Sequence, residues 1–261
     1  MSAGLWLPAT TLWQREVIRF MRQRSRVLGA LGTPIVFWMV VGSGLRNSFQ
    51  LGGAAGSSMN YMQYAFAGTL VMIVLFTAIF SMISVIEDRS EGFLQAVVAA
   101  PVRRGAIVLG KVLGSTTLAV GQSLLFLLLA PLSGVPLSAT STIALLGVLI
   151  VVGLGLSALG FLIAWPMEST QGFHAIMNLF LLPMWMLSGA LFPSTGASVW
   201  IQWVMAANPL TYGVASVRHA LYHGNAAAMA DLPSLGVSLG VTLGFAVVMI
   251  VLASKVVSRR G

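Results

Sequence analysis

The sequence contains no cysteine, which excludes disulfide bonds, a thiolate metal site and a cysteine nucleophile. Charged residues are scarce as well: they form 8% of the chain, against roughly 25% in a soluble domain. Of these charged residues 14 are basic and 6 are acidic, so the net charge is +8. The chain is instead rich in apolar residues, with 57% hydrophobic residues and a mean hydropathy of +0.93. This composition is typical of a membrane protein.

Six apolar segments are long enough to cross a membrane. A helix that spans the ~30 Å hydrocarbon layer needs about 20 mostly apolar residues. The six segments are Val27 to Leu45, Tyr61 to Ile86, Ala106 to Leu132, Ser141 to Ala164, His174 to Phe192 and Leu235 to Ser254. The longest stretch outside them has about 40 residues, too few to fold a core unaided. We therefore predict an all-α polytopic membrane protein, with residues 1–261 forming a single transmembrane domain.

A seventh apolar segment, Val199 to Val217, carries Gln202, Asn208 and Pro209 near its middle. A lipid-exposed helix would leave these groups poorly satisfied, and proline has no backbone N–H to donate. We therefore predict two short helices that are broken at Asn208 and Pro209.

The distribution of basic residues favours six crossings over seven, because positive residues stay on the cytoplasmic side. Basic residues precede the first segment and follow the last, so both termini are predicted to be cytoplasmic, which requires an even count. The twelve basic residues then placed inside are Arg15, Arg19, Arg22, Arg24, Arg26, Arg89, Arg103, Arg104, Lys111, Lys255, Arg259 and Arg260. Arg46 and Arg218 fall outside. The excess charge is thus a topology signal, whereas nucleic-acid binding would need a water-facing basic patch.

The start of the chain also imitates a cleaved signal peptide. A basic stretch and an apolar run are followed by the small residues "GGAAG" at Gly52 to Gly56. The apolar run is longer than the roughly 7 to 15 residues of a typical signal core. We therefore favour a retained first crossing.

The stretch "GAIVLGKVLG" resembles a nucleotide-binding P-loop. Gly105, Gly110 and Lys111 occupy three of its four defining positions, but Val112 stands where a Ser or Thr would hold Mg²⁺. A phosphate cradle also needs exposed backbone N–H groups, whereas this run continues into a long apolar segment. We predict that this chain does not bind ATP.

An amphipathic helix is predicted before the first crossing. Trp13, Val17, Phe20 and Met21 lie on one side at helical spacing, opposite Arg15, Arg19, Arg22 and Arg26. Such a helix lies at the membrane surface. It is interpreted either as a basic anchor on lipid or as a docking surface for another subunit, and the sequence leaves both open.

The loop from Glu87 to Gly105 holds three acidic residues followed by an apolar patch. The patch consists of Phe93, Leu94, Val97 and Val98. Gly92 precedes it and Pro101 stops it, which predicts a short helix along the cytoplasmic surface. The patch would pack on its own helices or dock a partner, and both remain open. Glu87, Asp88 and Arg89 are expected to be exposed at the end of the second crossing, where such pairs contribute little.

Three stretches of the chain carry a family resemblance. They are "DRSEGFLQAVVAAPVRRGAIVLGKVLG", "QGFHAIMNLFLLPMWMLSGALFP" and "NPLTYGVASVRHAL". Together they resemble the permease subunit of type 2 ABC exporters, in the group that contains drug-efflux and nodulation-factor permeases. The resemblance spans essentially the whole chain, and its order of elements agrees with six crossings.

The resemblance implies a coupling helix within residues 87–105 that docks into a separate ATPase subunit. It assigns this role to Glu87, Asp88, Arg89, Gly92, Phe93 and Pro101, beside the apolar Leu94 and Val97. It also implies an interfacial helix over residues 10–26 and an external pair of re-entrant helices within 192–224, broken at Asn208 and Pro209. ATP and Mg²⁺ would then bind the partner ATPase, and this chain would hold no cofactor.

The resemblance places the P-loop-like stretch at the start of the third crossing. Lys111 is then expected just inside the cytoplasmic leaflet, reaching back toward the lipid headgroups. Gly110 and Gly114 form a face of small residues that suits close helix contact. Gly240 and Gly244 repeat this spacing in the sixth crossing.

Catalytic and metal-binding interpretations find little support. His219 and His223 lie one helical turn apart, but Ala220 replaces the glutamate of the zinc-protease motif. The third histidine, His174, is predicted on the opposite side of the membrane. We therefore expect neither a metal site nor a catalytic residue.

Few polar residues lie within the predicted crossings. Such groups mark a transport path or form hydrogen bonds between helices, and both interpretations stay open. No charged residue is predicted at the midplane, which does not favour transport of small ions. Neighbouring methionines and aromatic residues suit an apolar or amphipathic cargo, and ordinary packing against lipid explains them nearly as well. The candidate path residues are Gln122, Met177, Asn178 and Trp185.

We therefore predict the transmembrane subunit of an ATP-driven ABC exporter that moves an apolar or amphipathic substrate, such as a drug, a lipid or a lipid-linked glycan, out of the cytoplasm or the inner leaflet. The expected partners are ABC ATPase subunits, a second permease copy or homologue, and membrane lipid, but no nucleic acid. The expected location is the inner (plasma) membrane, with both termini cytoplasmic. The alternative is a membrane enzyme or scaffold protein that acts without ATP.

Overall fold

The computed structural model describes residues 4–45, 50–51, 59–99, 103–223, 226–229 and 232–259. The first helices are α1 (Trp6–Arg22), α2 (Arg24–Gly44), α3 (Tyr61–Phe80), α4 (Ile83–Ser90), α5 (Phe93–Ala99), α6 (Arg104–Leu127) and α7 (Ala130–Ser133). The others are α8 (Ala139–Ala164), α9 (Thr170–Trp185), the π-helical turn η1 (Met186–Ala190), α10 (Val199–Ala207), α11 (Pro209–Leu221), α12 (Ala226–Met229) and α13 (Leu235–Arg259). The strands β1 (Gln50–Leu51) and β2 (Met59–Asn60) pair antiparallel, a small addition to the predicted all-α fold.

Five helical stretches of the described chain are long and apolar enough to cross a membrane. They are Tyr61–Ser90, Arg104–Leu127, Ala139–Ala164, Thr170–Ala190 and Leu235–Ser258. Helix α2 adds a shorter apolar stretch, Gly29–Gly44. The prediction of an all-helical polytopic membrane protein is therefore confirmed.

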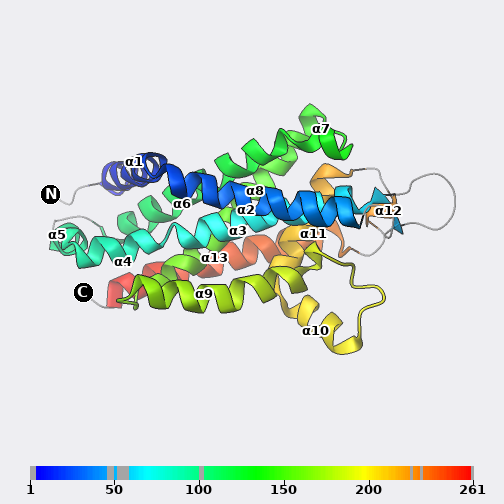
Figure 1. Ribbon diagram of the computed structural model, residues 1–261. Coiled ribbons are helices and arrows are strands. Elements are labelled where there is room, and N and C mark those ends of the chain that lie inside the picture. Colours follow the sequence, from blue (N-terminus) through cyan, green and yellow to red (C-terminus); the bar gives the residue numbers. More distant parts are fainter. Residues whose placement is uncertain are drawn as a thin grey trace.

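The long helices lie along one another and form an elongated bundle (Figure 1). Helices α1 and α5 and the carboxyl-terminal part of α13 lie at one end, which we call the α5 end. Helices α10 and α12 lie at the other end, which we call the α10 end. The two functional regions described below occupy these two ends.

Helix α3 is the centre of the bundle, and most of its residues are buried against α2, α6 and α8. Its start is a capping box, in which Asn60 Oδ1 accepts the N–H of Gln63 at 2.9 Å and Gln63 Oε1 accepts the N–H of Asn60 at 3.2 Å. Further along, the Phe66 and Phe126 rings stack with centroids 4.8 Å apart, and Trp38 meets both edge-on. Close side-chain packing of this kind holds helices together in a membrane, where water does not drive their association.

A turn interrupts the second apolar segment, where the sequence predicts one crossing. The turn lies at Ser81 and Met82 and separates α3 from α4. The Oγ of Ser81 donates to the carbonyl oxygen of Thr77 at 2.7 Å, so this buried hydroxyl has a partner. Helix α4, which follows the turn, carries Asp88.

The segment from Val199 to Val217 consists of two helices, with Asn208 between them at ψ 115°. The amide of Asn208 donates to the carbonyl oxygens of Met184 at 2.6 Å and Leu187 at 3.1 Å. Its Oδ1 accepts the N–H of Leu210 at 3.0 Å and so caps α11. The junction is thereby tied to the end of α9.

Only some of the glycines in the crossings serve close contact. A Cβ at Gly68 would lie 2.5 Å from the carbonyl oxygen of Ala190, so α3 and η1 touch because Gly68 has no side chain. At Gly240 and Gly244 a Cβ would meet nothing within 4 Å among the described residues. The repeated spacing at Gly240 and Gly244 therefore serves no close contact among the described residues, because this face of α13 points away from the bundle.

Candidate functional site

The helices of the α5 end meet around one buried carboxylate, that of Asp88 on α4, which is 0% exposed. Arg15 of α1 holds it with two hydrogen bonds, from Nη1 to Oδ2 at 2.9 Å and from Nη2 to Oδ1 at 2.7 Å. Arg19, one turn further along α1, donates from Nη1 to Oδ1 at 2.8 Å. A guanidinium that meets both oxygens of a carboxylate is a strong and directional pair. Asp88 therefore holds α1 and α4 in a defined relative position.

A third cation, Lys111 of α6, reaches the same carboxylate from inside the bundle. Lys111 is 1% exposed, and its Nζ donates to Asp88 Oδ2, to Glu16 Oε1 at 2.5 Å and to Ser84 Oγ at 3.0 Å. These contacts match the three donors of an ammonium group. We call Arg15, Glu16, Arg19, Asp88 and Lys111 the ion cluster. It joins α1, α4 and α6.

Glu87 and Glu91 extend the ion cluster toward the surface. The Nη2 of Arg19 lies 3.0 Å from Glu87 Oε2 and 3.4 Å from Glu91 Oε1. The Glu91 side chain is 57% exposed, so its pair contributes little, about 0 to 1 kcal/mol. The hydrogen bond to Asp88 raises the pKa of Arg15, which keeps this guanidinium charged.

The ion cluster corrects two expectations from the sequence. Lys111 does not reach the lipid headgroups, because two carboxylates inside the bundle hold its ammonium group. Asp88 is not an exposed charge at the end of its crossing, since its carboxylate is fully buried. A charge in an apolar interior needs an opposite charge beside it, and here three different helices provide them.

Glu16 is a site residue that the sequence analysis missed. It is 6% exposed and is the only carboxylate on α1. The sequence does contain a signal for this site. Glu16 is a single acid among five arginines, and Lys111 is a lysine inside an apolar segment. Each of these charges needs a partner when it is buried. Their separation along the chain hid the pairing.

Helix α1 comes close to α6 because α6 has no side chains at the contact. A Cβ at Gly110 would lie 2.6 Å from the Cβ of Leu12, and a Cβ at Gly114 would lie 2.7 Å from the Cβ of Glu16. The predicted close helix contact at Gly110 and Gly114 is confirmed, with α1 as the partner. The P-loop-like stretch is thus a helical surface on which α1 packs.

Helix α1 has three faces, where the sequence indicated two. The face toward the bundle is buried and consists of Ala9, Leu12, Glu16 and Phe20. An apolar face is exposed and includes Trp6, Leu7, Trp13 and Met21. Val17 is half-buried, and the Nε1 of Trp13 donates to Thr117 Oγ1 at 3.0 Å. Arg15 and Arg19 form the third face, toward α4.

The short helix α5 follows Gly92, whose φ of +78° is a conformation that glycine adopts at little cost. Leu94 is 5% exposed and points into the bundle. Phe93 and Val97 are half-buried and pack against the core. The guanidinium carbon of Arg15 lies 3.8 Å from the centroid of the Phe93 ring, so the ion cluster touches α5 directly.

The outer face of α5 is exposed. It carries Gln95, Ala96 and Ala99. The apolar patch identified in the sequence thus packs partly on its own chain, and parts of Phe93 and Val97 stay exposed beside this face. Pro101 lies outside the described residues.

Arg89 links α4 to the connection between α8 and α9. Its Nη1 donates to the carbonyl oxygen of Met167 at 3.3 Å, and its Nη2 donates to that of Trp165. The guanidinium also lies 5.2 Å from the centroid of the Trp165 ring. Helix α4 therefore holds a second connection at the α5 end.

Comparison with known proteins shows the family of the chain. The ABC-2 type transporter family model matches residues 9–222. The chain belongs to the ABC-2 type transporter family. It is 24% identical over 216 residues to ycf38 of Porphyra purpurea, named as a transport permease, with 80% of this chain and 72% of that protein covered. It is 26% identical over 224 residues to nodulation protein J of Rhizobium leguminosarum bv. viciae, with 83% and 82% covered.

The predicted family is thereby confirmed. ABC-2 permeases are transmembrane subunits without catalytic activity, and they partner with ABC ATPase subunits. This chain is such a permease subunit. The comparisons name no substrate for it.

Three candidate path residues of the permease lie inside the helix packing. Trp185 and Met177 are each 1% exposed, and Gln122 is 4% exposed. The Nε1 of Trp185 donates to the carbonyl oxygen of Gly68 at 2.8 Å. The Oε1 of Gln122 accepts from Thr77 Oγ1 at 2.5 Å, whereas its Nε2 is buried without a partner. These residues join helices within one permease copy.

The fourth candidate, Asn178, lines a cavity of about 520 Å³ between α2, α3 and α9. The lining includes Phe20, Pro34, Met72, Phe76, Thr77 and His174. The cavity is mainly apolar with a few polar groups, as in sites for small molecules. Its position gives the permease an apolar recess beside α2 and α9.

One serine of the permease lies in a sequence pattern that resembles a hydrolase motif. Gly236 to Gly240 reads G-V-S-L-G, the spacing of a nucleophile elbow. Ser238 lies instead in the first turn of α13, buried, with its Oγ donating to the carbonyl oxygen of Pro233 at 3.3 Å. His219 Nε2 lies 2.9 Å from the same oxygen. In the part of the chain that the structure describes, no group of three His or acidic residues could hold a metal ion.

Proposed function

We propose that this permease is the transmembrane half of an ATP-driven exporter, with α5 as the coupling helix. The observation that carries this proposal is the ion cluster, which clamps α1, α4 and α6 directly behind α5. Two permeases, identical or homologous, and two ABC ATPase subunits would form the transporter. ATP and Mg²⁺ would bind the ATPase subunits.

A coupling helix must pass its motion to the crossings, and Arg15 provides the link. It covers the Phe93 ring of α5 and also holds Asp88 of α4. Lys111 extends the connection to α6. Separating these buried charges would leave each without a partner, which is costly, so the three helices are expected to move as one unit.

The cavity that Asn178 lines supports an apolar or amphipathic cargo. Its volume of about 520 Å³ falls in the range of small-molecule sites, roughly 300 to 1,000 Å³. Its polar residues are Thr33, Thr77, Ser81, His174 and Asn178. A drug, a lipid or a lipid-linked glycan offers the matching combination of apolar body and polar group.

The proposed topology has the α5 end in the cytoplasm of an inner (plasma) membrane. Most basic residues and both described chain ends lie there, as the positive-inside rule requires (Figure 1). Six crossings would be made by α2, α3 with α4, α6, α8, α9 with η1, and α13. Helices α10 and α11 would form a re-entrant pair from the external side.

The full permease and its ABC ATPase partner provide the test, with matched glutamine variants. Gln95→Arg places a charge on the outer face of α5, whereas Gln14→Arg places the same charge on an exposed position of α1. We expect Gln95→Arg to weaken ATPase binding by about 10-fold or more, because an interface core tolerates an added charge poorly. Gln14→Arg should leave binding within about threefold.

A third variant, Leu94→Ala, separates docking from packing. Its side chain points into the bundle, so we expect a lower Tm of the isolated permease and little change in ATPase affinity. Unchanged affinity in Gln95→Arg would remove the coupling-helix assignment. Substrate transport in vesicles without any ATPase would favour the alternative of a membrane protein that acts without ATP.

A further inference from the structure

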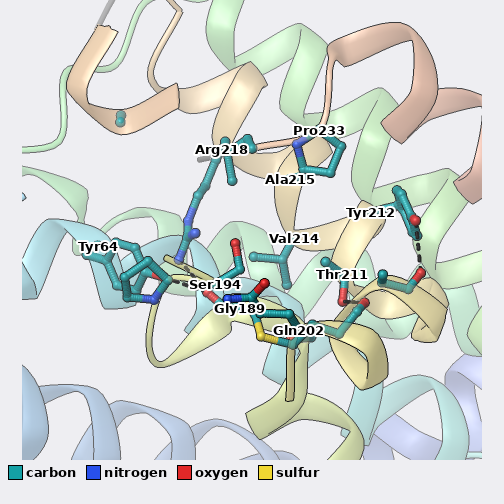
Figure 2. Close-up of a pocket in the computed structure, with 16 residues that line it drawn as sticks. Tyr64, Gly189, Ser194, Gln202, Thr211, Tyr212, Val214, Ala215, Arg218 and Pro233 are labelled. Carbon is teal, nitrogen blue, oxygen red and sulfur yellow. Dashed lines mark hydrogen bonds between the residues drawn. The ribbon is translucent and has the colours of Figure 1, made fainter. Parts of the chain in front are cut away.

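The α10 end contains a second buried charge, Arg218 of α11, which is 3% exposed. Its Nη2 donates to the carbonyl oxygen of Gly189 at 2.8 Å, and its guanidinium carbon lies 3.8 Å from the centroid of the Tyr64 ring. Figure 2 shows Arg218 extending from α11 toward these two residues. Its Nε is buried and has no hydrogen-bond partner. The guanidinium therefore retains donor capacity that the described chain does not use.

No described carboxylate neutralises Arg218. The described acids are Glu16, Glu87, Asp88, Glu91 and Glu168, and all belong to the elements of the α5 end. The sixth acid, Asp231, lies outside the described residues. A buried cation without a counter-charge is unfavourable, and in this position it also departs from the tendency of basic residues to stay on the cytoplasmic side.

Arg218 lines a cavity of about 450 Å³, a size typical of ligand sites. Polar residues of the wall include Tyr64, Ser188, Ser194, Gln202 and Thr211 (Figure 2). Met205, Val214 and Ala215 add apolar surface. The hydroxyls of Tyr64, Ser188 and Thr211 already donate to backbone carbonyl oxygens, so Arg218 is the group of the wall that an anion would meet.

The helix that supplies Gln202 to this cavity also carries exposed tryptophans. Trp200 is 64% exposed and Trp203 is 74% exposed on α10. Exposed tryptophans gather at the boundary between membrane and water. The cavity is therefore expected at the depth of the lipid headgroups.

We propose that this cavity binds the anionic head group of an amphipathic molecule, a phosphate or a carboxylate, and that Arg218 pairs with it. A guanidinium matches the geometry of these oxygen groups with parallel hydrogen bonds. The apolar wall accommodates the part of the molecule next to its head group. The proposed binding site follows from the geometry of the α10 end and is the same for either direction of transport.

The probe is dioctanoyl phosphatidylglycerol, added to the purified full-length permease in a neutral detergent. Dioctanoyl phosphatidylcholine, whose head group has no net charge, and inorganic phosphate serve as comparisons. Binding is followed by tryptophan fluorescence and by the increase in Tm. We expect phosphatidylglycerol to bind at least about 10-fold more tightly than either comparison. Equal binding of inorganic phosphate would overturn the assignment to an amphipathic molecule.

Two variants connect binding to the cavity. Arg218→Gln should weaken phosphatidylglycerol binding by about 10-fold or more, and Arg218→Lys should retain part of it. Because Arg218 also holds Gly189, Ala206→Phe provides an independent test: it fills the cavity from α10 and leaves Arg218 in place. Ala207→Phe alters the neighbouring exposed position and should leave binding within about twofold.

The chain's own acid provides the decisive control. Binding by Asp231→Asn, together with no binding by the wild-type permease, would identify Asp231 as the partner of Arg218 and overturn the proposal. Equal binding by wild type, Arg218→Gln and Ala206→Phe would also overturn it. Loss of binding in Arg218→Gln and Ala206→Phe, with Ala207→Phe unaffected, is the expected result.

Discussion

The two ends of this permease bury charge in opposite ways. At the α5 end, Asp88 receives hydrogen bonds from Arg15, Arg19 and Lys111, and Glu16 also contacts Lys111. At the α10 end, Arg218 meets a carbonyl oxygen and an aromatic ring, with no described carboxylate beside it. The first arrangement is electrically satisfied by described residues, whereas no described carboxylate neutralises the second.

Under the two proposals, this difference gives the two ends different tasks. Charges that pair across three helices fix the positions of those helices and retain little capacity for a ligand. They suit the transmission of motion from α5. A cation with an unused donor in a cavity gains from an anion that enters, so the α10 end suits recognition. The comparison is testable because substitutions at the two ends should differ in cost.

The largest effect is expected for Lys111→Met. This change leaves Glu16 and Asp88 buried with less positive charge, and breaking a buried pair in this way costs about 3 to 5 kcal/mol. The free energy of unfolding in detergent measures it. Lys255→Met, at an exposed position of α13, is the control and should change stability by less than about 0.5 kcal/mol.

A double variant sharpens this result. Adding Glu16→Gln to Lys111→Met removes a carboxylate that Lys111 no longer neutralises, so the double variant should lose less stability than the two single changes added together. Strict additivity would show that the ion cluster is not one coupled unit.

An intermediate effect is expected for Gly110→Ala. The new Cβ would lie 2.6 Å from the Cβ of Leu12, and overpacking of this kind costs about 1 to 3 kcal/mol. Gly240→Ala is the matched change toward the other end, where a Cβ meets nothing within 4 Å. It should be neutral or stabilise by up to about 1 kcal/mol, because alanine favours a helix. Equal losses in unfolding experiments on both variants would contradict the α1–α6 contact.

The smallest loss is expected for Arg218→Met, measured without added anion. The change removes a hydrogen bond and a cation–π contact, together about 1 to 2 kcal/mol, and leaves no described carboxylate unpaired. Its cost should therefore stay below that of Lys111→Met. A loss as large as that of Lys111→Met would reveal a counter-charge beside Arg218 and remove the contrast between the two ends.

Several parts of the fold follow from local sequence. The long apolar runs predict the helices, because a chain in lipid must satisfy its backbone hydrogen bonds within each segment. The helix break lies at Asn208, where Pro209 supplies a ready first helical residue and Asn208 caps it. Gly92 precedes α5 with a positive φ that its residue type favours. Each of these features depends on neighbours in the chain.

The details of the site could not be predicted in the same way. Hydrophobic spacing showed an apolar patch on α5 but not that Leu94 points inward while Gln95 faces outward. It also indicated two faces on α1, because the buried Glu16 breaks the apolar pattern of the face that packs on α6. The direction in which an amphipathic helix turns its faces depends on what lies beside it.

The sequence by itself determined the membrane class, the positions of the apolar segments and the family of this permease. Only the tertiary structure decided which charges meet. Glu16 and Lys111 are 95 residues apart, and Arg15 and Asp88 are 73 apart, so no local pattern could pair them. The same structure placed Arg218 far from every described acid. The physical reason is that the free energy of a buried charge depends on the charges beside it in space. Helix α1 reaches those charges only because Gly110 and Gly114 allow it to approach α6.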